Sequence, residues 1–140
     1  MEHLTEAARI RRAVLRFNRR LRQERGDGSL SPNQLSVLGH LYRHGPSTPG
    51  EVAVAERQRP QSLTRVFAEL EAEGLVGRAP DPSDRRQSVL SLTGAGRRAL
   101  EDDMAQRDAW LAGALGALSE TERGVLSLAA AVLERLGDAE

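Results

Sequence analysis

Apolar residues recur at helical spacing along most of this chain, and the pattern predicts a mostly α protein. Long apolar stripes run through residues 4–25, 94–118 and 119–136. Shorter amphipathic segments lie between them, at residues 32–44, 49–55 and 60–74. We therefore expect long helices at both ends of the chain and a group of short helices in between.

The predicted helices begin at recognisable capping sequences. Ser31-Pro32-Asn33-Gln34 places a serine at the N-cap, a proline in the first turn and a glutamine at the capping-box position. The segments 48–51 and 119–122 repeat the capping-box spacing, and Thr93 is expected to cap the helix that follows it. The Gly26–Ser29 segment is expected to end the first helix.

A helix-turn-helix followed by a β-hairpin is predicted in the middle of the chain. Residues 56–58 form the short turn between two helices, which is typical of helix-turn-helix pairs. Strands are expected to start at Leu75-Val76 and to return through residues 89–92, around a turn at residues 80–84. Together these elements predict a winged helix-turn-helix.

The helix opened by Pro60 has an unusual exposed face. At about 100° per residue, one face collects the expected buried positions, which are Leu63, Val66, Phe67, Leu70 and Gly74. The opposite side collects Gln61, Arg65, Ala68 and Ala72, flanked by Ser62 and Thr64. Glutamine pairs with adenine, arginine with guanine, and hydroxyls with phosphates or base edges, so this face suits a major groove. Glu69, Glu71 and Glu73 are expected to point away from phosphate. An ordinary amphipathic helix is the alternative.

The expected hairpin tip carries two arginines. A guanidinium on a narrow loop can enter the minor groove, where the phosphate potential is most negative, and Arg85 and Arg86 are the candidates. Asp84 beside them is expected to orient an arginine and brace the loop. A solvated turn with a local ion pair is the alternative.

Composition narrows the function classes. All 20 basic residues are arginine, they balance 20 acidic residues, and there is no cysteine. The absence of cysteine excludes a disulfide framework, a thiolate metal site and a thiol redox sensor. The charge is unevenly distributed: residues 1–25 and 57–98 are net basic, and residues 99–140 are net acidic. Because no signal peptide or membrane-spanning apolar run is present, we expect a cytoplasmic protein without membrane association.

The remaining candidate metal-binding, effector-binding and catalytic residues give weaker signals. His40 and His44 have a metal-chelating spacing, but no further ligand lies near them in sequence, so no metal site is expected. Phe17 and Trp110 can line an effector pocket or belong to a core or dimer interface. No nucleophile elbow, phosphate-binding loop or paired-carboxylate motif is present. We therefore expect no catalytic residues and no cofactor.

The order of these elements resembles the multiple-antibiotic-resistance regulator (MarR) family of winged-helix transcription factors. The most specific segments are Pro60–Arg65, Leu70–Val76, Asp81–Arg86 and Leu90–Thr93, and the match covers nearly the whole chain. The resemblance implies a single MarR-type domain over residues 1–140. Its DNA-binding lobe would span residues 31–93, and residues 1–30 and 94–140 would supply dimerisation helices.

The resemblance also implies residue roles. Arg86 would enter the minor groove and Asp84 would hold the wing by a salt bridge. A small aromatic or phenolic effector would bind between the dimerisation helices and the winged helix, with Phe17, His40 and Trp110 as candidate pocket residues.

These observations predict a homodimer that binds a pseudo-palindromic double-stranded operator and regulates transcription, as a repressor released by a small effector. Its DNA-reading residues would be Gln61, Ser62, Thr64 and Arg65 in the helix and Asp84, Arg85 and Arg86 in the wing. Two alternatives stay open: an architectural DNA-binding protein without effector response, and a helical protein–protein adaptor.

Overall fold

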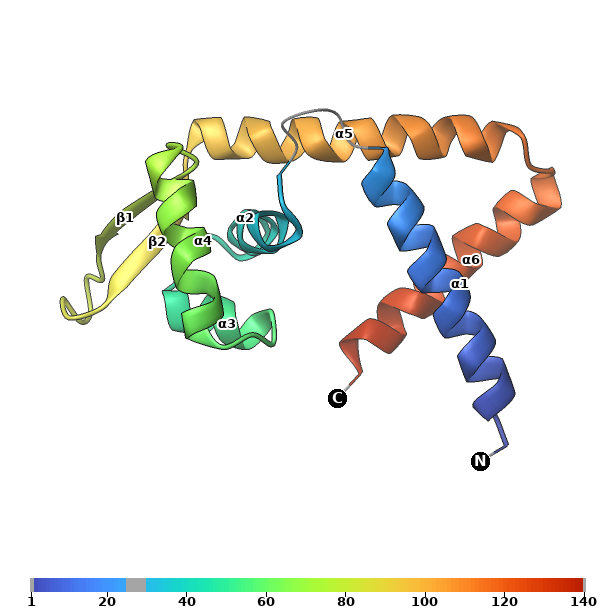
Figure 1. Ribbon diagram of the computed structural model, residues 1–140, viewed down its shortest axis with the longest axis horizontal. Helices are drawn as coiled ribbons and strands as arrows, with labels where there is room; N and C mark the ends of the chain where they lie inside the picture. Colours follow the sequence, from blue (N-terminus) through green and yellow to red (C-terminus); the bar gives the residue numbers. More distant parts are fainter. Residues whose placement is uncertain (1, 25–29, 140) are drawn as a thin grey trace. The chain divides into compact units, whose positions relative to one another are not determined.

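A computed structural model describes residues 2–24 and 30–139 and divides them into two units. The helical unit comprises residues 2–24 and 106–139, and the winged-helix unit comprises residues 30–105. The elements, labelled in Figure 1, are α1 (Leu4–Gln23), α2 (Pro32–His44), α3 (Pro49–Ala55), α4 (Pro60–Ala72), β1 (Val76–Pro80), β2 (Ser88–Leu92), α5 (Gly94–Gly116) and α6 (Glu120–Asp138). The expected fold class, mostly α with a small β-hairpin, is confirmed.

The capping sequences start the helices as predicted. Ser31 Oγ accepts a hydrogen bond from Gln34 N, and Gln34 Oε1 accepts one from Ser31 N, which is a complete capping box. Ser119 and Glu122 form the same box at the start of α6. The third box is only half formed: Thr48 Oγ1 caps Glu51 N, but the carboxylate of Glu51 takes the Thr48 hydroxyl instead of its backbone N–H.

Several boundaries differ from the predictions. α1 ends at Gln23, and the expected stop at Gly26–Ser29 lies outside the described residues. Gly74 was placed on the buried face of α4, and this is wrong. It is exposed and follows the helix with φ +74°, the left-handed conformation that commonly ends helices. Tyr42 of α2 is 43% exposed, and the guanidinium of Arg97 lies over its ring.

The turn of the helix-turn-helix is unusual in its backbone. α3 ends at Ala55 and α4 begins at Pro60, so the short connection is confirmed. Arg57 within it has φ +52°, a left-handed conformation that side chains other than glycine rarely adopt. Gln58 anchors the turn, since its N–H donates to Ala53 O and its side-chain amide donates to Asn33 Oδ1.

The hairpin is antiparallel, and its register runs from Val76↔Leu92 to Pro80↔Ser88. A third segment joins it: Ser47 exchanges two backbone hydrogen bonds with Leu90, at 3.0 and 2.8 Å. This bridge ties the connection between α2 and α3 to the wing. The bridge could not be predicted from the sequence, because one isolated bridging residue has no alternating pattern.

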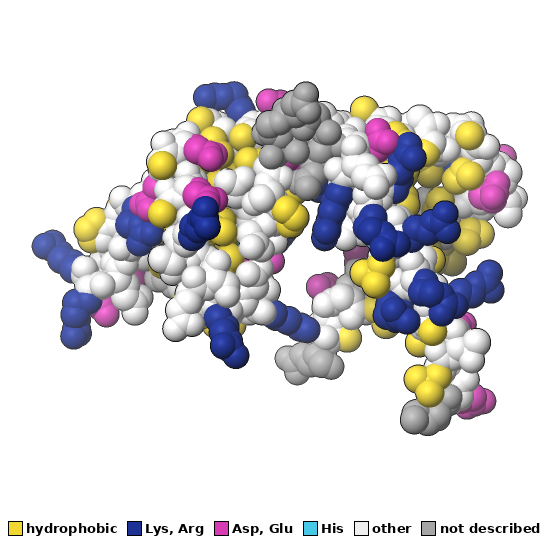
Figure 2. All heavy atoms as spheres, in the orientation of Figure 1, with side chains coloured by type: hydrophobic (Ala, Val, Ile, Leu, Met, Phe, Trp, Pro, Cys, Tyr) yellow, Lys and Arg dark blue, Asp and Glu magenta, His cyan; other side chains and the backbone are white. Residues whose placement is uncertain are grey.

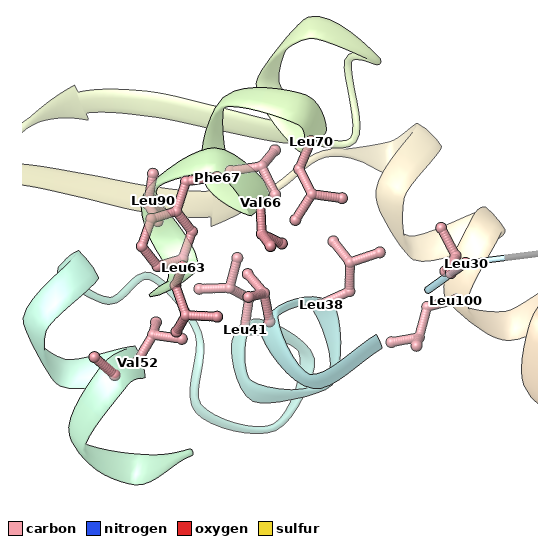
Figure 3. Close-up of a cluster of buried hydrophobic side chains, with 13 residues drawn as sticks. Leu30, Leu38, Leu41, Val52, Leu63, Val66, Phe67, Leu70, Leu90 and Leu100 are labelled. Atoms are coloured by element: carbon pink, nitrogen blue, oxygen red, sulfur yellow. The ribbon is translucent and has the colours of Figure 1, made fainter. Parts of the chain in front are cut away.

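The winged-helix unit has a continuous apolar core. Figure 3 shows side chains from α2, α3, α4, β2 and α5 converging on one cluster. Leu38, Leu63, Leu70 and Leu90 are completely shielded from solvent. The buried carboxylate of Asp103 accepts a hydrogen bond from Leu30 N at 3.0 Å, and so fixes the segment entering α2 against α5. Residues 94–105 therefore pack with this unit.

The helical unit is built differently. α1 and α6 cross beside the second half of α5 (Figure 1), and neither α1 nor α6 has a buried residue among those described. Most of their apolar side chains are exposed, and the others, such as Leu21 and Val132, are only partly buried. No described helix combines the length and the apolar character that crossing a membrane requires.

Candidate nucleic-acid interface

The exposed face of α4 has the predicted composition. Gln61, Ser62, Thr64 and Arg65 are all exposed, as are the small residues Ala68 and Ala72. The opposite face, with Leu63, Val66, Phe67 and Leu70, is buried in the core. The core therefore fixes the rotation of α4 about its axis, and presents the amide, hydroxyl and guanidinium groups to solvent together.

The start of α4 is open to an anion. α2, α3 and α6 each have a side-chain cap, but among the described residues none caps α4, whose N-cap is Arg59. The positive end of the helix dipole attracts phosphate here, although Pro60 has no N–H and Ser62 N already donates to Arg59 O. Thr64 Oγ1 donates to Pro60 O at 3.1 Å, so its hydroxyl is held against the helix and retains only acceptor capacity.

Acidic residues of α4 hold arginines. Arg65 Nε donates to Glu69 Oε1 at 3.1 Å, one turn along the same face. Glu71 receives two hydrogen bonds from Arg78 of β1, at 2.7 and 3.3 Å, which brace the end of α4 against the wing. The sequence pattern predicted only that these carboxylates point away from phosphate. The spacing of four residues between Arg65 and Glu69 was the signal available for that pair.

The tip of the wing is shaped by two aspartates. Asp81 Oδ1 accepts hydrogen bonds from the backbone N–H and the hydroxyl of Ser83, and these bonds lower the pKa of Asp81. Asp84 Oδ1 accepts from Arg86 N at 3.1 Å and lies 3.5 Å from Arg86 Nε. The side chain of Arg86 is 94% exposed, and Arg85 is exposed beside it. Figure 2 shows basic side chains at the outer end of this hairpin.

Thr93, which follows β2, connects the end of α4 to the start of α5. Thr93 Oγ1 donates to Gly74 O at 2.7 Å and accepts from Gly96 N at 3.0 Å. The capping half of this arrangement was predicted. The bond to Gly74, nineteen positions earlier, was not, because sequence gives no sign of which carbonyl lies beside the cap.

His40 is buried within the winged-helix unit. Its Nε2 lies 3.1 Å from Ser47 Oγ, and the Ser47 hydroxyl already donates to Gly45 O. Nε2 must therefore carry the proton and donate to Ser47. Burial, and then the neighbouring His44, lower the pKa of His40. The two rings lie 4.7 Å apart and line an open cavity of about 760 Å³ with Thr48, Glu51 and Gln87. Among the described residues, no three metal-ligating side chains come together.

The helical unit brings Phe17 and Trp110 together. Their ring centroids lie 6.4 Å apart, and the guanidinium of Arg20 stacks 5.0 Å from the Trp110 ring. Phe17 also lines a mainly apolar groove of about 540 Å³, whose other large side chains are Leu111, Leu115, Leu126, Leu133 and the charged Arg123. Of the three predicted effector-pocket residues, two therefore belong to this unit, and His40 belongs to the winged-helix unit.

A tight helix-turn-helix, a hairpin wing with arginines at its tip and an uncapped, polar second helix define a winged-helix DNA-binding protein. A sequence model of the MarR family matches residues 29–87. An HTH-type transcriptional regulator of Mycobacterium tuberculosis is 40% identical over 126 residues, which cover 90% of this chain and 88% of that protein. The chain belongs to the MarR family and is a DNA-binding transcriptional regulator.

Two further similarities agree with this assignment. A transcriptional regulator of Pseudomonas aeruginosa has a crystal structure that superposes with a TM-score of 0.85 and 40% identity, over 99% of this chain and 98% of that one. The HTH-type transcriptional repressor MdtR of Bacillus subtilis is 36% identical over 93 residues, which cover 66% of this chain and 60% of the repressor.

Proposed function

We propose that this protein represses transcription as a homodimer that places one winged-helix unit on each half of a near-palindromic operator. In each half, the exposed face of α4 enters the major groove and the tip of the wing enters the adjacent minor groove. The observation that carries this proposal is the face of α4. This face presents Gln61, Ser62 and Arg65, and the small residues Ala68 and Ala72 follow them along the helix. The side chain of Arg65 is 90% exposed. Since the chromosome is the target, the protein would act in the cytoplasm.

The distribution of charge supports DNA binding by a chain without net charge. Each wing tip carries two exposed arginines, while its aspartates, Asp81 and Asp84, accept hydrogen bonds from the loop itself, and the start of α4 has no side-chain cap. Two of the acidic residues of α4 are already paired with arginines of the same unit. A phosphate approaching the start of α4 or the wing therefore meets positive potential, although the charges of the whole chain cancel.

The surface of the helical unit supports the dimer. Five of its large apolar side chains are between 42% and 48% exposed, and all but Ile10 line the apolar groove: Ile10, Val14, Phe17, Leu126 and Leu133. A contiguous apolar surface of this kind marks an interaction site. Residues 1–25 are net basic and residues 99–140 net acidic, so a second copy related by a two-fold axis can match both shape and charge.

We also propose that a small aromatic effector uses the Phe17–Trp110 pair. The two rings and the guanidinium of Arg20 offer stacking surfaces and a positive charge. Trp110 is the single tryptophan of the chain, so its fluorescence reports binding directly. Benzoate and phenol are suitable probes. Saturable quenching, lost in Phe17→Ala, is the expected result, and quenching that is linear in probe concentration would contradict it.

Two arginine substitutions test the proposed DNA contacts. Arg65→Ala should cost about 1–3 kcal/mol on the preferred site and relax the preference at one base pair, because this side chain is placed to read a base edge. Arg86→Ala should weaken binding on many sequences and reduce the preference for A·T-rich flanks, because this side chain reads groove shape and potential. Affinity for DNA selected from genomic fragments by the purified protein provides the measurement.

The salt dependence of binding separates the proposed function from its alternatives. The affinity of the wild-type protein for DNA should fall steeply as the salt concentration increases, since phosphate contacts release counterions. If both variants stay folded and keep wild-type affinity at physiological salt, the proposed contacts are wrong. A protein–protein adaptor would show no salt-dependent DNA binding at all.

A further inference from the structure

The recognition helix carries a carboxylate next to the arginine that is proposed to read a base. Glu69 follows Arg65 by one helical turn, and its Oε1 accepts the Nε–H of Arg65 at 3.1 Å. The side chain of Arg65 is 90% exposed and that of Glu69 is 42% exposed. Apart from this bond, the guanidinium projects into solvent.

A guanidinium has five N–H donors in a planar fork, one on Nε and four on the two terminal nitrogens. Glu69 takes the Nε–H and leaves the terminal edge of the fork for a ligand. Guanine presents two acceptors, O6 and N7, to a pair of such donors in the major groove. The contact with Glu69 therefore restricts Arg65 without using the edge that a guanine needs.

Arg78 provides an internal comparison. Its Nε and one terminal nitrogen both bind Glu71, at 2.7 and 3.3 Å, and its side chain is only 38% exposed. The Nε edge of the Arg78 guanidinium is occupied by Glu71, and this contact holds the wing against the end of α4. The Arg65–Glu69 pair is the more open of the two, which fits a side chain that is oriented but still free to bind.

We propose that Glu69 is a positioning residue for DNA recognition, which holds Arg65 toward a base edge and away from phosphate. This inference rests on the proposed contact of Arg65 with DNA. An exposed arginine without a partner can pair with any phosphate, and such contacts carry no sequence information. A carboxylate on the same face repels phosphate and directs the terminal N–H groups outward, so it exchanges some affinity for selectivity.

Two substitutions at the same position test this role. Glu69→Gln removes the charge but keeps an oxygen acceptor for the Nε–H, and Glu69→Ala removes both. Discrimination is measured as the dissociation constant for a site that lacks the base pair whose preference Arg65→Ala relaxes, divided by the dissociation constant for a site that contains it. Glu69→Ala should lower this ratio about two- to fivefold, the effect of losing one exposed ion pair. Glu69→Gln should stay closer to wild type, and both variants should bind non-specific DNA more tightly.

A third variant controls for charge alone. Glu73 is exposed and follows α4 directly as its C-cap, so Glu73→Gln removes the same charge near the same helix without touching Arg65. It should leave the ratio unchanged. The Glu69→Ala effect should also vanish in an Arg65→Ala background, because a positioning residue acts only through the side chain that it positions.

The outcomes separate this inference from the function on which it rests. If Arg65→Ala relaxes a base preference but Glu69→Ala does not, the DNA contact stands and the role of Glu69 is wrong. An undiminished Glu69 effect in the Arg65→Ala background, or equal losses in the Gln and Ala variants, would also overturn it. If Arg65→Ala changes no preference, the proposed contact and the role of Glu69 fail together.

Discussion

The two units of this chain bury their apolar residues to very different degrees. The winged-helix unit closes thirteen apolar side chains into one core, four of them leucines without solvent contact. In the helical unit, no described residue of α1 or α6 is buried, and Phe17, Leu126 and Leu133 remain 43–48% exposed. One unit completes its own core, and the other leaves an apolar face exposed.

The division suits a regulator that must present two DNA-reading surfaces at a fixed distance. A self-contained winged helix keeps α4 and the wing rigid relative to each other, through the core, the Arg78–Glu71 pair and the Thr93–Gly74 bond. In the proposed dimer, a second copy would complete the core of the helical unit, so its folding and its dimerisation would be coupled. Substitutions in the two units should therefore have different consequences.

The largest effect is expected from Gly96→Ala in the winged-helix unit. A Cβ at this position would lie 2.0 Å from the carbonyl oxygen of Leu75 and 2.9 Å from a methyl group of Leu92. The backbone must move to relieve this overlap, which should cost about 3 kcal/mol or more in the free energy of unfolding. Urea unfolding followed by circular dichroism measures the change.

Gly94→Ala is the matched control, two residues earlier in the same helix. Its new Cβ would meet only the end of the flexible Arg98 side chain, at 3.5 Å. The unfolding free energy should change by less than about 1 kcal/mol. Equal destabilisation by both substitutions would show that α5 does not pack closely against Leu75.

A smaller loss, and one that depends on protein concentration, is expected from Leu133→Glu in the helical unit. A charge in the apolar groove prevents its burial by a partner, and the lost leucine burial alone costs about 1.5–3 kcal/mol. Sedimentation should show dissociation to monomers, and affinity for the full palindrome should collapse because two half-sites are no longer linked.

Ala131→Glu controls for the added charge. Ala131 is exposed on the polar side of α6, near Glu134 and Arg135, and does not line the groove. This variant should remain a dimer and bind DNA as the wild type does. A dimeric Leu133→Glu protein that still bound the full site would place the interface elsewhere.

The smallest effect concerns pH and the winged-helix unit. Burial and His44 lower the pKa of native His40, Arg43 adds to this, and Glu56 and Glu51 oppose it. Below a pH of about 6.5 the unfolded chain takes up a proton that native His40 resists, so the free energy of unfolding should fall as pH decreases. His40→Gln keeps an N–H for Ser47 and should flatten this dependence, whereas His44→Gln should not abolish it. Thermal unfolding measured between about pH 5 and 8 tests this prediction. Identical pH profiles for His40→Gln and wild type would show that His40 does not cause the pH dependence.

Local signals in the sequence predicted most of the fold. The serine and threonine caps located α2, α3 and α6, and the helical period separated the two faces of α4 correctly. These features depend on residues within one or two turns of each other. Gly74 was misplaced because the helical spacing of apolar positions extends to it in the sequence, whereas its backbone has already adopted the left-handed conformation that ends the helix.

Contacts between residues far apart in the sequence could not be predicted. The Asp103–Leu30 bond spans 73 positions, and the Ser47–Leu90 bridge joins a loop to a strand. Nothing local to Asp103 marks its carboxylate as buried. In the candidate interface, the residue types could be predicted and the spacing of Arg65 and Glu69 was a usable signal, but the partner of Arg78 required the geometry of the strand beside α4.

The paired arrangement of DNA-reading units is tested most directly by hydroxyl-radical footprinting on a DNA site that the wild-type protein selects. Two units related by a two-fold axis must meet successive grooves on one face of the duplex. The footprint should therefore show two protected half-sites of inverted sequence, with centres about 10 bp apart or a multiple of that distance. Protection of one isolated half-site by a single copy of the chain would contradict the account.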